Sequence, residues 1–399
     1  MLKKLKFILM NKVQSYSEKK ILISMTRPWY FNFFLLPAML FAGGLLLPEN
    51  GMAQINFKGY EALFTIPKNY QVLYTGNAPV INGLIDEAEW SHAAWSDLFV
   101  DIEGSLKPTP SLETRVKMLW TDSSLYIAAS LQEPGVWATL THRDDIIFHD
   151  NDFEVFIDAD NNTHQYTEIE VNAYNTIFDL LMPKPYRNGS GAMIGHDVAG
   201  LKTAVKVNGT INNEGDKDSG WTIEMAIPFR SLYINNEQGI PKEGALWRIN
   251  FSRVQWQTEV LNGRYVRKKN DTGKLLPENN WVWSPQGVIN MHYPERWGYL
   301  YFTKQDATSH FDLPYNEKRK PYLWLVYYKQ HAYRTTHGKF ATSLAQLGID
   351  SPAISIGGIS NTLCIEATTR QFMVYISDKH DSLSVNEVGL VQQTMPPAN

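Results

Sequence analysis

Short runs in which hydrophobic and polar residues alternate fill most of the chain between residues 70 and 303. In the run TEIEVNA, Ile169 and Val171 fall on one side while Glu168 and Glu170 fall on the other. A period of two is typical of a β-strand that buries one face. Similar runs recur between turn-forming residues, and hardly any stretch has the period of an amphipathic helix. The pattern predicts an all-β antiparallel sandwich over residues 70–303.

Two segments give the clearest local signals within this region. Residues 114–131 contain two β-rich runs on either side of the turn-forming sequence Asp122-Ser123-Ser124, which predicts a hairpin. Residues 151–158, NDFEVFID, are predicted to form a strand that ends in a turn rich in Asp and Asn.

A different pattern begins at Pro321. Residues 322–337 contain no Gly or Pro and stop before Gly338, which indicates a helix, and its apolar residues cover most of the circumference. Such a helix is expected to be buried against a sheet, and the alternating runs that follow predict a β-meander. We therefore predict a small α+β module with a long N-terminal helix over residues 321–399, after a charged linker over residues 304–320.

The N-terminal region has the pattern of an export signal. Arg27 precedes an apolar run over residues 29–47, and small Ala53 offers a cleavage point. We expect an export signal over residues 1–53, a connector over residues 54–69, and a periplasmic, cell-surface or extracellular protein. Membrane retention by this segment is the alternative, because the run approaches the ~20 residues that span a bilayer. No Cys follows it, so no lipid anchor is expected.

Composition narrows the choice of partners. With 37 basic and 41 acidic residues, the formal net charge is −4, which gives no electrostatic basis for binding nucleic acid. Aromatic residues make up 13% of the chain, enough to fill a β-rich core and also to present flat faces to a ligand. The single cysteine, Cys364, excludes an intrachain disulfide and is expected to be a small buried hydrophobic residue.

The acids and amides around residues 148–162 have the residue types of a metal site. Asp158, Asp160 and Asn162 fit the first, third and fifth positions of an EF-hand loop. Thr163 and Ile169 stand where that loop requires Gly and a bidentate Glu, so the EF-hand is excluded. A looser calcium site with Asp158 and Asp160 stays open, although such residues more often bond to the backbone of their own turn.

Catalysis and ligand binding are the other two interpretations. Glu154 with Glu168 or Glu170 has the residue types of a glycoside hydrolase pair, but nothing in the sequence fixes their separation. Polar side chains on one strand face also suit a saccharide groove, where aromatic rings stack on the sugar and carboxylates or amides bond its hydroxyl groups. Aromatic residues near predicted strand ends are Trp137, Phe148, Trp256, Trp281, Trp283 and Tyr293.

Seven motifs occur in a set order along residues 70–303. They are PVINGLIDEAEW, RVKMLWTDSSLYIAASL, NDFEVFID, EVNAYN, GWTIEMAIPF, RINFSRVQ and ERWGYLYF. Together they resemble the family 9 carbohydrate-binding modules, which are relatives of the DOMON domains. The resemblance implies a β-sandwich that binds glycans, as do the modules attached to secreted xylanases.

The resemblance also implies roles for individual residues. Glu154 and Asn172 match polar ligand-binding positions of the family. Phe148 and Met291 stand where the family has its two clamping Trp residues, and Glu170 stands where it has an Arg. In the family, the two Trp residues clamp a terminal sugar. The changes at Phe148, Met291 and Glu170 imply that this chain still binds carbohydrate but not the same terminal sugar. The family also holds calcium away from the sugar, and Asp86 and Glu87 in GLIDEAEW are candidate ligands here.

Our leading hypothesis is a secreted carbohydrate-binding protein that recognises oligo- or polysaccharide in carbohydrate catabolism and has no chemistry of its own. One alternative is a glycoside hydrolase that uses Glu154 and Glu170. Another is a haem-binding, DOMON-type electron-transfer domain with ligands among Met291, His149 and His292. No other cofactor is expected apart from structural calcium. The candidate ligand-binding residues are Phe148, Glu154, Glu170, Asn172, Met291, Trp137, Trp283 and His292.

Overall fold

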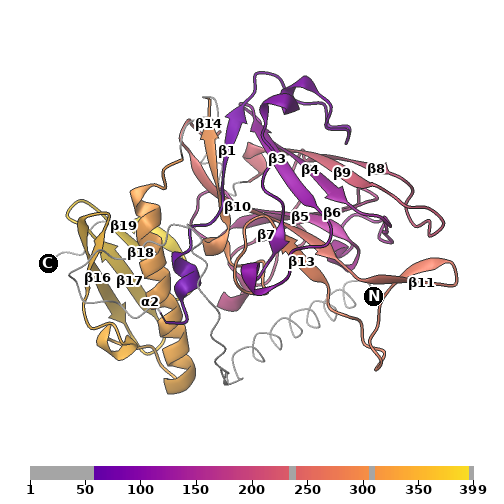
Figure 1. Cartoon of the computed structure of the whole chain (residues 1–399). Helices are drawn as coiled ribbons and strands as arrows, with labels where there is room; N and C mark the ends of the chain where they lie inside the picture. The colour runs from indigo at the N-terminus through magenta and orange to yellow at the C-terminus, as the bar shows by residue number, and fades with distance from the viewer. Residues whose placement is uncertain (1–57, 233–239, 305–310, 395–399) are drawn as a thin grey trace, which may run out of the picture. The chain divides into compact units, whose positions relative to one another are not determined.

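The computed structural model describes residues 58–232, 240–304 and 311–394, which all fall in one compact unit over residues 44–399 (Figure 1). The expected export signal over residues 1–53 lies outside the described residues. Within the three described ranges, no helix is both long and apolar enough to cross a membrane.

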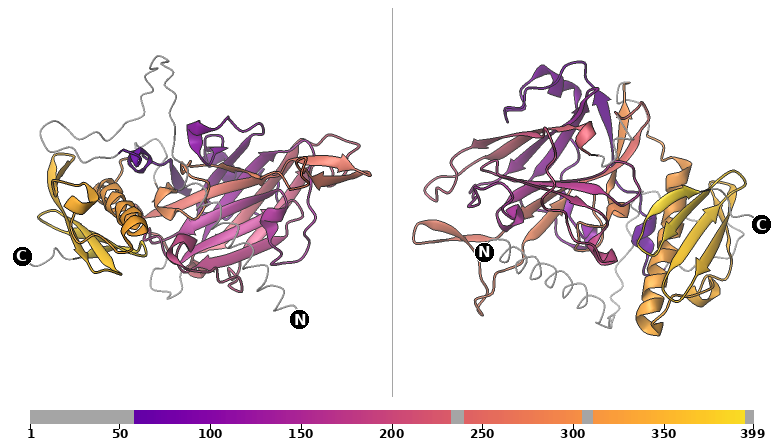
Figure 2. Two further views of the ribbon diagram at one scale, coloured as in Figure 1. Left: turned by 90° about the horizontal axis from the view of Figure 1, so that it is seen from below. Right: turned by 180° about the vertical axis from the view of Figure 1, so that it is seen from behind.

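A curled mixed sheet of twelve strands, counted over the described residues, forms the larger part of the molecule (Figures 1 and 2). Its order is β7-β6-β5-β10-β14-β1-β3-β4-β9-β8, and β13 pairs with both β10 and β2. The strands are β1 (Asn69–Tyr74), β2 (Val100–Asp101), β3 (Thr114–Trp120), β4 (Ser124–Gln132), β5 (Asp152–Asp158), β6 (Tyr166–Asn172), β7 (Ile177–Met182), β8 (Lys202–Asn208), β9 (Gly220–Pro228), β10 (Leu246–Gln255), β13 (Asn279–Val282) and β14 (Gly298–Thr303). Strands β11 (Thr258–Leu261) and β12 (Arg264–Arg267) form a separate hairpin.

The predicted strands are confirmed, but the prediction of a purely antiparallel sheet is wrong. Strands β3 and β4 form the expected hairpin, and β5 pairs antiparallel with β6. Strand β1 runs parallel to both of its neighbours, β14 and β3. A long connection over residues 75–113 separates β1 from β3, so no tight turn forces these two strands to be antiparallel.

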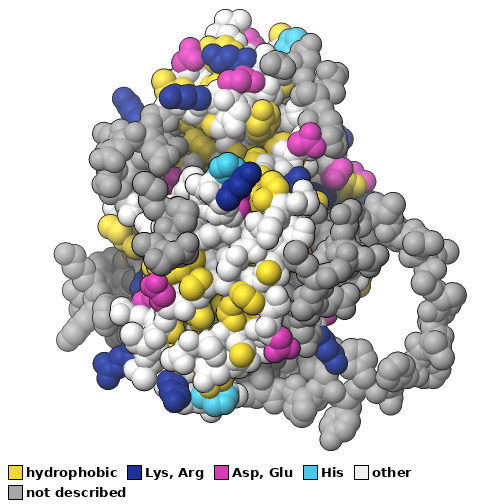
Figure 3. Space-filling model, turned by 90° about the vertical axis from the view of Figure 1, so that its left-hand side faces the viewer, with side chains coloured by type: hydrophobic (Ala, Val, Ile, Leu, Met, Phe, Trp, Pro, Cys, Tyr) yellow, Lys and Arg dark blue, Asp and Glu magenta, His cyan; other side chains and the backbone are white. Residues whose placement is uncertain are grey.

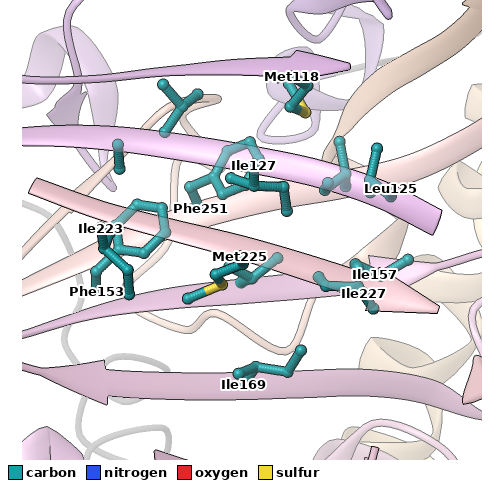
Figure 4. Packing of buried hydrophobic residues seen from close by; sticks show 14 of the residues in the cluster. Met118, Leu125, Ile127, Phe153, Ile157, Ile169, Ile223, Met225, Ile227 and Phe251 are labelled. Carbon is teal, nitrogen blue, oxygen red and sulfur yellow. The ribbon is translucent and has the colours of Figure 1, made fainter. Parts of the chain in front are cut away.

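The main hydrophobic core lies between the two halves of the curled sheet. Strand alternation directs Met118 of β3 and Ile127 of β4 into the same cluster as Phe153 of β5 and Phe251 of β10, and all four are completely buried (Figure 4). The rings of Phe153 and Phe251 stack with their centroids 5.8 Å apart. Each buried side chain of this size contributes about 1.5–3 kcal/mol by leaving water. The opposite sides of β5, β6 and β10 therefore face away from this core.

The C-terminal part contains the predicted helix followed by a five-stranded antiparallel meander (Figure 1). Its cluster of buried residues includes Leu323 and Val326 of the helix and Val374 of the sheet. Two residues of the expected connector, Leu63 and Phe64 in the 3-10 helix η1 (Glu61–Phe64), pack into the same cluster. The elements are α2 (Tyr315–His337), β15 (Ala353–Ile356), β16 (Ile359–Ala367), β17 (Phe372–Ser377), β18 (Ser382–Asn386) and β19 (Val391–Thr394).

The helix begins earlier than predicted. The sequence predicts a start at Pro321, whereas α2 begins at Tyr315 after Pro314 and contains Pro321 internally. Residues 315–320 of the expected linker are therefore helical. Pro314 is the better start signal, because the residue before a helix needs extended backbone, and Pro314 has a ψ of 148°.

Cys364 also differs from expectation, because it is exposed on β16. Alternation along the strand buries Leu363 and turns the next side chain, Cys364, outwards.

On the face of the molecule shown in Figure 3, hydrophobic side chains are dispersed among polar ones.

Candidate functional site

Five carboxylates of β5 and β6 point away from the main core, and we call the four that remain when Asp158, at the end of β5, is set apart the acid face. It consists of Asp152, Glu154, Glu168 and Glu170. Their placement follows from strand parity, because Phe153 and Ile169 between them point into the core. The alternation seen in the sequence therefore predicted correctly that these acids share one side of adjacent strands.

The strand register brings the acids close together. Glu154 lies directly opposite Glu170 on β6 and opposite Ser252 on β10. Carboxylate oxygens of Asp152, Glu154 and Glu170 all lie within 4.8 Å of one another. Like charges at this separation repel strongly unless protons or a cation neutralise them.

The acid face is closed, contrary to the wet groove that the sequence suggested. Glu154 is 5% exposed, Glu170 is 3% exposed and Asp152 is completely buried. Two apolar clusters lie on this side of the sheet: one contains Ile147, Phe156, Met291 and Trp297, and the other contains Trp137, Val254 and Trp256. Most of these residues come from segments outside β5 and β6, which explains why strand pattern alone did not predict the closure.

Burial sets the protonation of the acid face. It raises the pKa of Glu154 to about 7. Burial also raises the pKa of Glu170 well above its ordinary value, and the charges of Glu154 and Glu168 raise it further. The pKa of Asp152 is raised in the same way, first by burial and then by Glu154. In the absence of a cation, the acid face therefore holds protons near neutral pH.

Asn172 lies at the end of the acid face and is completely buried. Its Nδ2 donates to the Leu140 carbonyl oxygen at 2.8 Å and to Asp150 at 3.0 Å. Its Oδ1 accepts from the backbone N–H groups of Tyr174 at 3.0 Å and Thr176 at 3.1 Å. These four bonds use the full hydrogen-bonding capacity of the amide, so the geometry gives Asn172 a role in organising this turn.

One end of the acid face is bounded by Phe148, which is half-buried. Its backbone N–H donates to Glu170 at 2.9 Å, and its carbonyl oxygen accepts from the indole of Trp256 at 2.8 Å. Trp137 packs with Trp256, and the guanidinium of Arg267 lies 4.6 Å from the Trp256 ring centroid. Phe148 is thus the aromatic side chain that links the acid face to the surface at this end.

His292 and Tyr186 bound the other end. The Nδ1 of His292 is 2.9 Å from the Tyr166 hydroxyl, and its Nε2 is 3.9 Å from Glu168. The rings of His292 and Tyr186 meet edge to face with centroids 4.5 Å apart. Burial, followed by the charge of Arg187, lowers the pKa of His292 to about 3, so the imidazole is neutral. Burial raises the pKa of Tyr186, and the charges of Glu168 and Glu170 raise it further.

Three of the predicted ligand residues, Trp137, Trp283 and Met291, are buried and are not available as stacking surfaces. Trp283 is 1% exposed and packs in the main core, where its ring lies beside Phe251 and the backbone of Gly298. Met291 is 9% exposed within the apolar cluster that covers the acid face, and its sulfur accepts from Gln286 at 3.1 Å. The structure therefore does not bring Trp283 to this side of the sheet.

The calcium candidates from the sequence do not converge. Asp160 accepts from the backbone and side chain of Asn162, and Asp158 accepts from the Thr163 N–H at 2.7 Å, which are bonds within one turn. Asp86 is exposed, and Glu87 accepts from Asn82 at 2.7 Å. Within the described ranges, groups of three or more carboxylates gather closely at the acid face and at a second group that consists of Asp144, Asp179 and Asp197.

That second carboxylate group has a cationic partner. Arg143 lies 2.8 Å from Asp197 and also pairs with Asp179. The charge there is partly offset within the protein, unlike that of the acid face.

Sequence reasoning missed Asp152 and Tyr186 as members of the site. The parity of Asp152 with Glu154 was a usable signal, because both point to the same side of β5. Tyr186 carried no signal, since it lies in the short 3-10 helix η5 (Tyr186–Asn188) after β7 and reaches the acids only through the fold.

Comparison with known proteins finds a family whose model matches the β-rich part of the chain. Residues 81–265 match the model of the carbohydrate family 9 binding domain-like family. Among solved structures, a putative carbohydrate-binding protein from Bacteroides uniformis is 15% identical, with 59% of this chain and 99% of that chain covered at a TM-score of 0.46.

Two structures of a family 9 carbohydrate-binding module from Caldicellulosiruptor kristjanssonii also match. The complex with cellotriose is 15% identical, with 62% of this chain and all of that chain covered at a TM-score of 0.36. The complex with glucose is 14% identical, with 61% of this chain and all of that chain covered at a TM-score of 0.37. None of the curated proteins compared with the chain matches it. The resemblance seen in the sequence motifs is thus confirmed over residues 81–265, which match the carbohydrate family 9 binding domain-like family.

Proposed function

We propose that this protein binds carbohydrate through its β-rich domain and carries out no chemistry on it. The observation that carries the proposal is the match of residues 81–265 to a family of carbohydrate-binding domains. The structure adds two half-buried aromatic residues, Phe148 and Tyr186, at opposite ends of a row of polar groups. This combination suits a saccharide, whose ring faces are apolar and whose edges carry hydroxyl groups.

Phe148 is the residue we expect to contact the sugar most directly. Its neighbour Glu170 is almost completely buried, so a saccharide would meet the rim of the acid face before it reached the carboxylates. Glu154, Glu170 and His292 would then support the binding surface from behind. This arrangement replaces the open groove that the sequence suggested.

The burial of the acids also argues against the hydrolase alternative. Glu154 and Glu170 face each other across β5 and β6, as two catalytic carboxylates would. A glycosidic bond has to lie between such carboxylates, and at 5% and 3% exposure they offer it little access. The haem alternative gains no support, because His149 follows Phe148 at one end of the acid face while His292 lies at the other.

Affinity electrophoresis through gels that contain soluble glucans or xylans tests the proposal. We expect retarded migration of the wild-type protein and loss of retardation in Phe148→Ala. A matched control is Trp95→Ala, because Trp95 is also half-buried and lies beside Arg115 on β3, away from the acid face. Release of reducing sugar from the same glycans, abolished in Glu154→Gln, would instead establish the hydrolase.

We further propose that the protein is exported and acts in polysaccharide breakdown. The support is the basic and apolar pattern of residues 27–53. Mass spectrometry of the protein purified from cell fractions tests it. An exported fraction that begins at Gln54 is the expected result, and an intact N-terminus in the membrane fraction would instead show retention.

A further inference from the structure

The acid face lacks a cationic partner of its own. None of the Lys and Arg residues in the described ranges forms an ion pair with Asp152, Glu154, Glu168 or Glu170, and the neutral His292 lies 3.9 Å from Glu168. Buried acids normally pair with Arg or Lys, as Glu133 does with Arg253 at 2.7 Å on the other side of β10.

Two carboxylate oxygens of this face also lack hydrogen-bond partners. Oδ2 of Asp152, a completely buried residue, has none, and neither has Oε2 of Glu168, which is 5% exposed. Most buried polar atoms in folded proteins are satisfied, so unpartnered acceptors in the same cluster point to a missing positively charged ligand.

We propose that Asp152, Glu154 and Glu170 bind a divalent cation of the calcium class. One oxygen from each residue lies within 4.8 Å of the others. Two ligands of one calcium ion, each about 2.3–2.6 Å from it, lie at most roughly 5 Å apart. The three oxygens therefore fit around a single calcium ion with only small side-chain movements.

The chemistry of the surroundings selects the class of ion. All the donors are hard oxygens, and the described residues place no Cys at this face, which disfavours zinc and copper. The Ser252 hydroxyl, opposite Glu154, is available as a further oxygen ligand, and water would fill the remaining positions of the six to eight oxygens that calcium prefers. Magnesium requires shorter bonds and a stricter octahedron than this spread of oxygens offers.

This site is separate from the calcium candidates Asp86, Glu87, Asp158 and Asp160, and the inference does not depend on carbohydrate binding. The rival explanation is that the acids stay neutral by sharing protons. The two explanations differ in what calcium does to stability, because an ion that binds only the folded state stabilises it by mass action.

The experiment uses the full-length protein, stripped with a chelator and dialysed into calcium-free buffer at pH 8. We expect elemental analysis of the protein re-equilibrated with calcium to show one calcium ion per chain above the background of the variants. We also expect calcium at about 100 times its dissociation constant to raise the Tm by roughly 3–4 °C, and magnesium at equal concentration to raise it much less. Long incubation is needed, because the site is nearly sealed.

Asp152→Asn, Glu154→Gln and Glu170→Gln should each remove the calcium-dependent Tm shift. These isosteric amides relieve repulsion, so their Tm without calcium should equal or exceed that of the wild type, which separates loss of binding from failure to fold. The matched control is Asp197→Asn in the carboxylate group that pairs with Arg143, and it should keep the full shift. A wild-type Tm that does not respond to millimolar calcium, or an unchanged shift in Glu154→Gln and Glu170→Gln, would overturn the proposal.

Discussion

Asn172 illustrates how a residue can match a ligand-binding position and still be fully used by the fold. Its amide makes four hydrogen bonds that connect the end of β6 to Leu140, Asp150 and the turn at residues 174–176. Strand parity predicted which side of β6 it occupies. The sequence could not predict its partners, because Leu140 and Asp150 precede β5 and meet Asn172 only in the folded chain.

We predict that Asn172→Ala mainly destabilises the protein. The change leaves the backbone N–H groups of Tyr174 and Thr176 without their acceptor, while the Leu140 carbonyl oxygen and the Asp150 carboxylate keep other donors. It should lower the free energy of unfolding by about 2–4 kcal/mol. Urea denaturation followed by Trp fluorescence measures this loss. Asn208→Ala, on the exposed end of β8, is the control and should change stability by less than about 0.5 kcal/mol. Normal stability with loss of glycan retention would show that Asn172 is a ligand-binding residue after all.

Among the elements, α2 shows where local pattern was informative and where it was not. Its apolar circumference predicted burial, and Leu323, Leu325 and Val326 are completely buried. The sequence pattern predicts a helix start at Pro321, but α2 begins at Tyr315 and contains Pro321. For the sheet, alternation predicted the strands but not the parallel placement of β1, since pairing partners that are far apart in sequence depend on the whole topology.

His331 makes the stability of α2 dependent on pH. Burial lowers its pKa to about 4, its Nε2 lies 3.0 Å from the Glu387 carbonyl oxygen, and Arg187 and Arg334 oppose its protonation further. Because the folded pKa lies below the unfolded value of 6.5, its contribution to stability is complete above about pH 6.5 and is lost as the pH falls towards 4. At about 1.4 kcal/mol per pH unit, the loss should reach roughly 3 kcal/mol.

The measurement is urea unfolding between pH 7.5 and 4. His331→Gln keeps a hydrogen-bond donor without a titrating group, so the variant should lose less stability on acidification than the wild type does. The remaining dependence belongs to other groups, including His164 and His292, whose pKa values burial also lowers. Equal acid sensitivity in wild type and variant would show that His331 is not responsible.

At the scale of the whole molecule, buried charges join α2 to the β-rich domain. Glu317 of α2 lies 3.3 Å from Arg248 of β10 and 2.8 Å from Lys320, and all three residues are buried. Arg248 also donates to the Trp297 carbonyl oxygen at 2.7 Å and to the Tyr299 hydroxyl at 2.6 Å. The sequence placed these residues in a charged linker and in a strand, and gave no sign that they would meet.

We predict that this contact makes the main hydrophobic core of the sheet and the C-terminal cluster around α2 unfold together. Glu317→Ala leaves Arg248 and Lys320 buried without a carboxylate, and it should cost about 3–5 kcal/mol. Calorimetry of the wild type should show a single transition, and the variant should unfold at lower temperature. Glu366→Ala on the exposed side of β16 is the matched control and should leave the transition in place. If the wild type unfolded in two separate steps, and Glu317→Ala moved only the earlier one, the β-rich domain would be stable without α2, and buried charge would serve only to hold the helix against it.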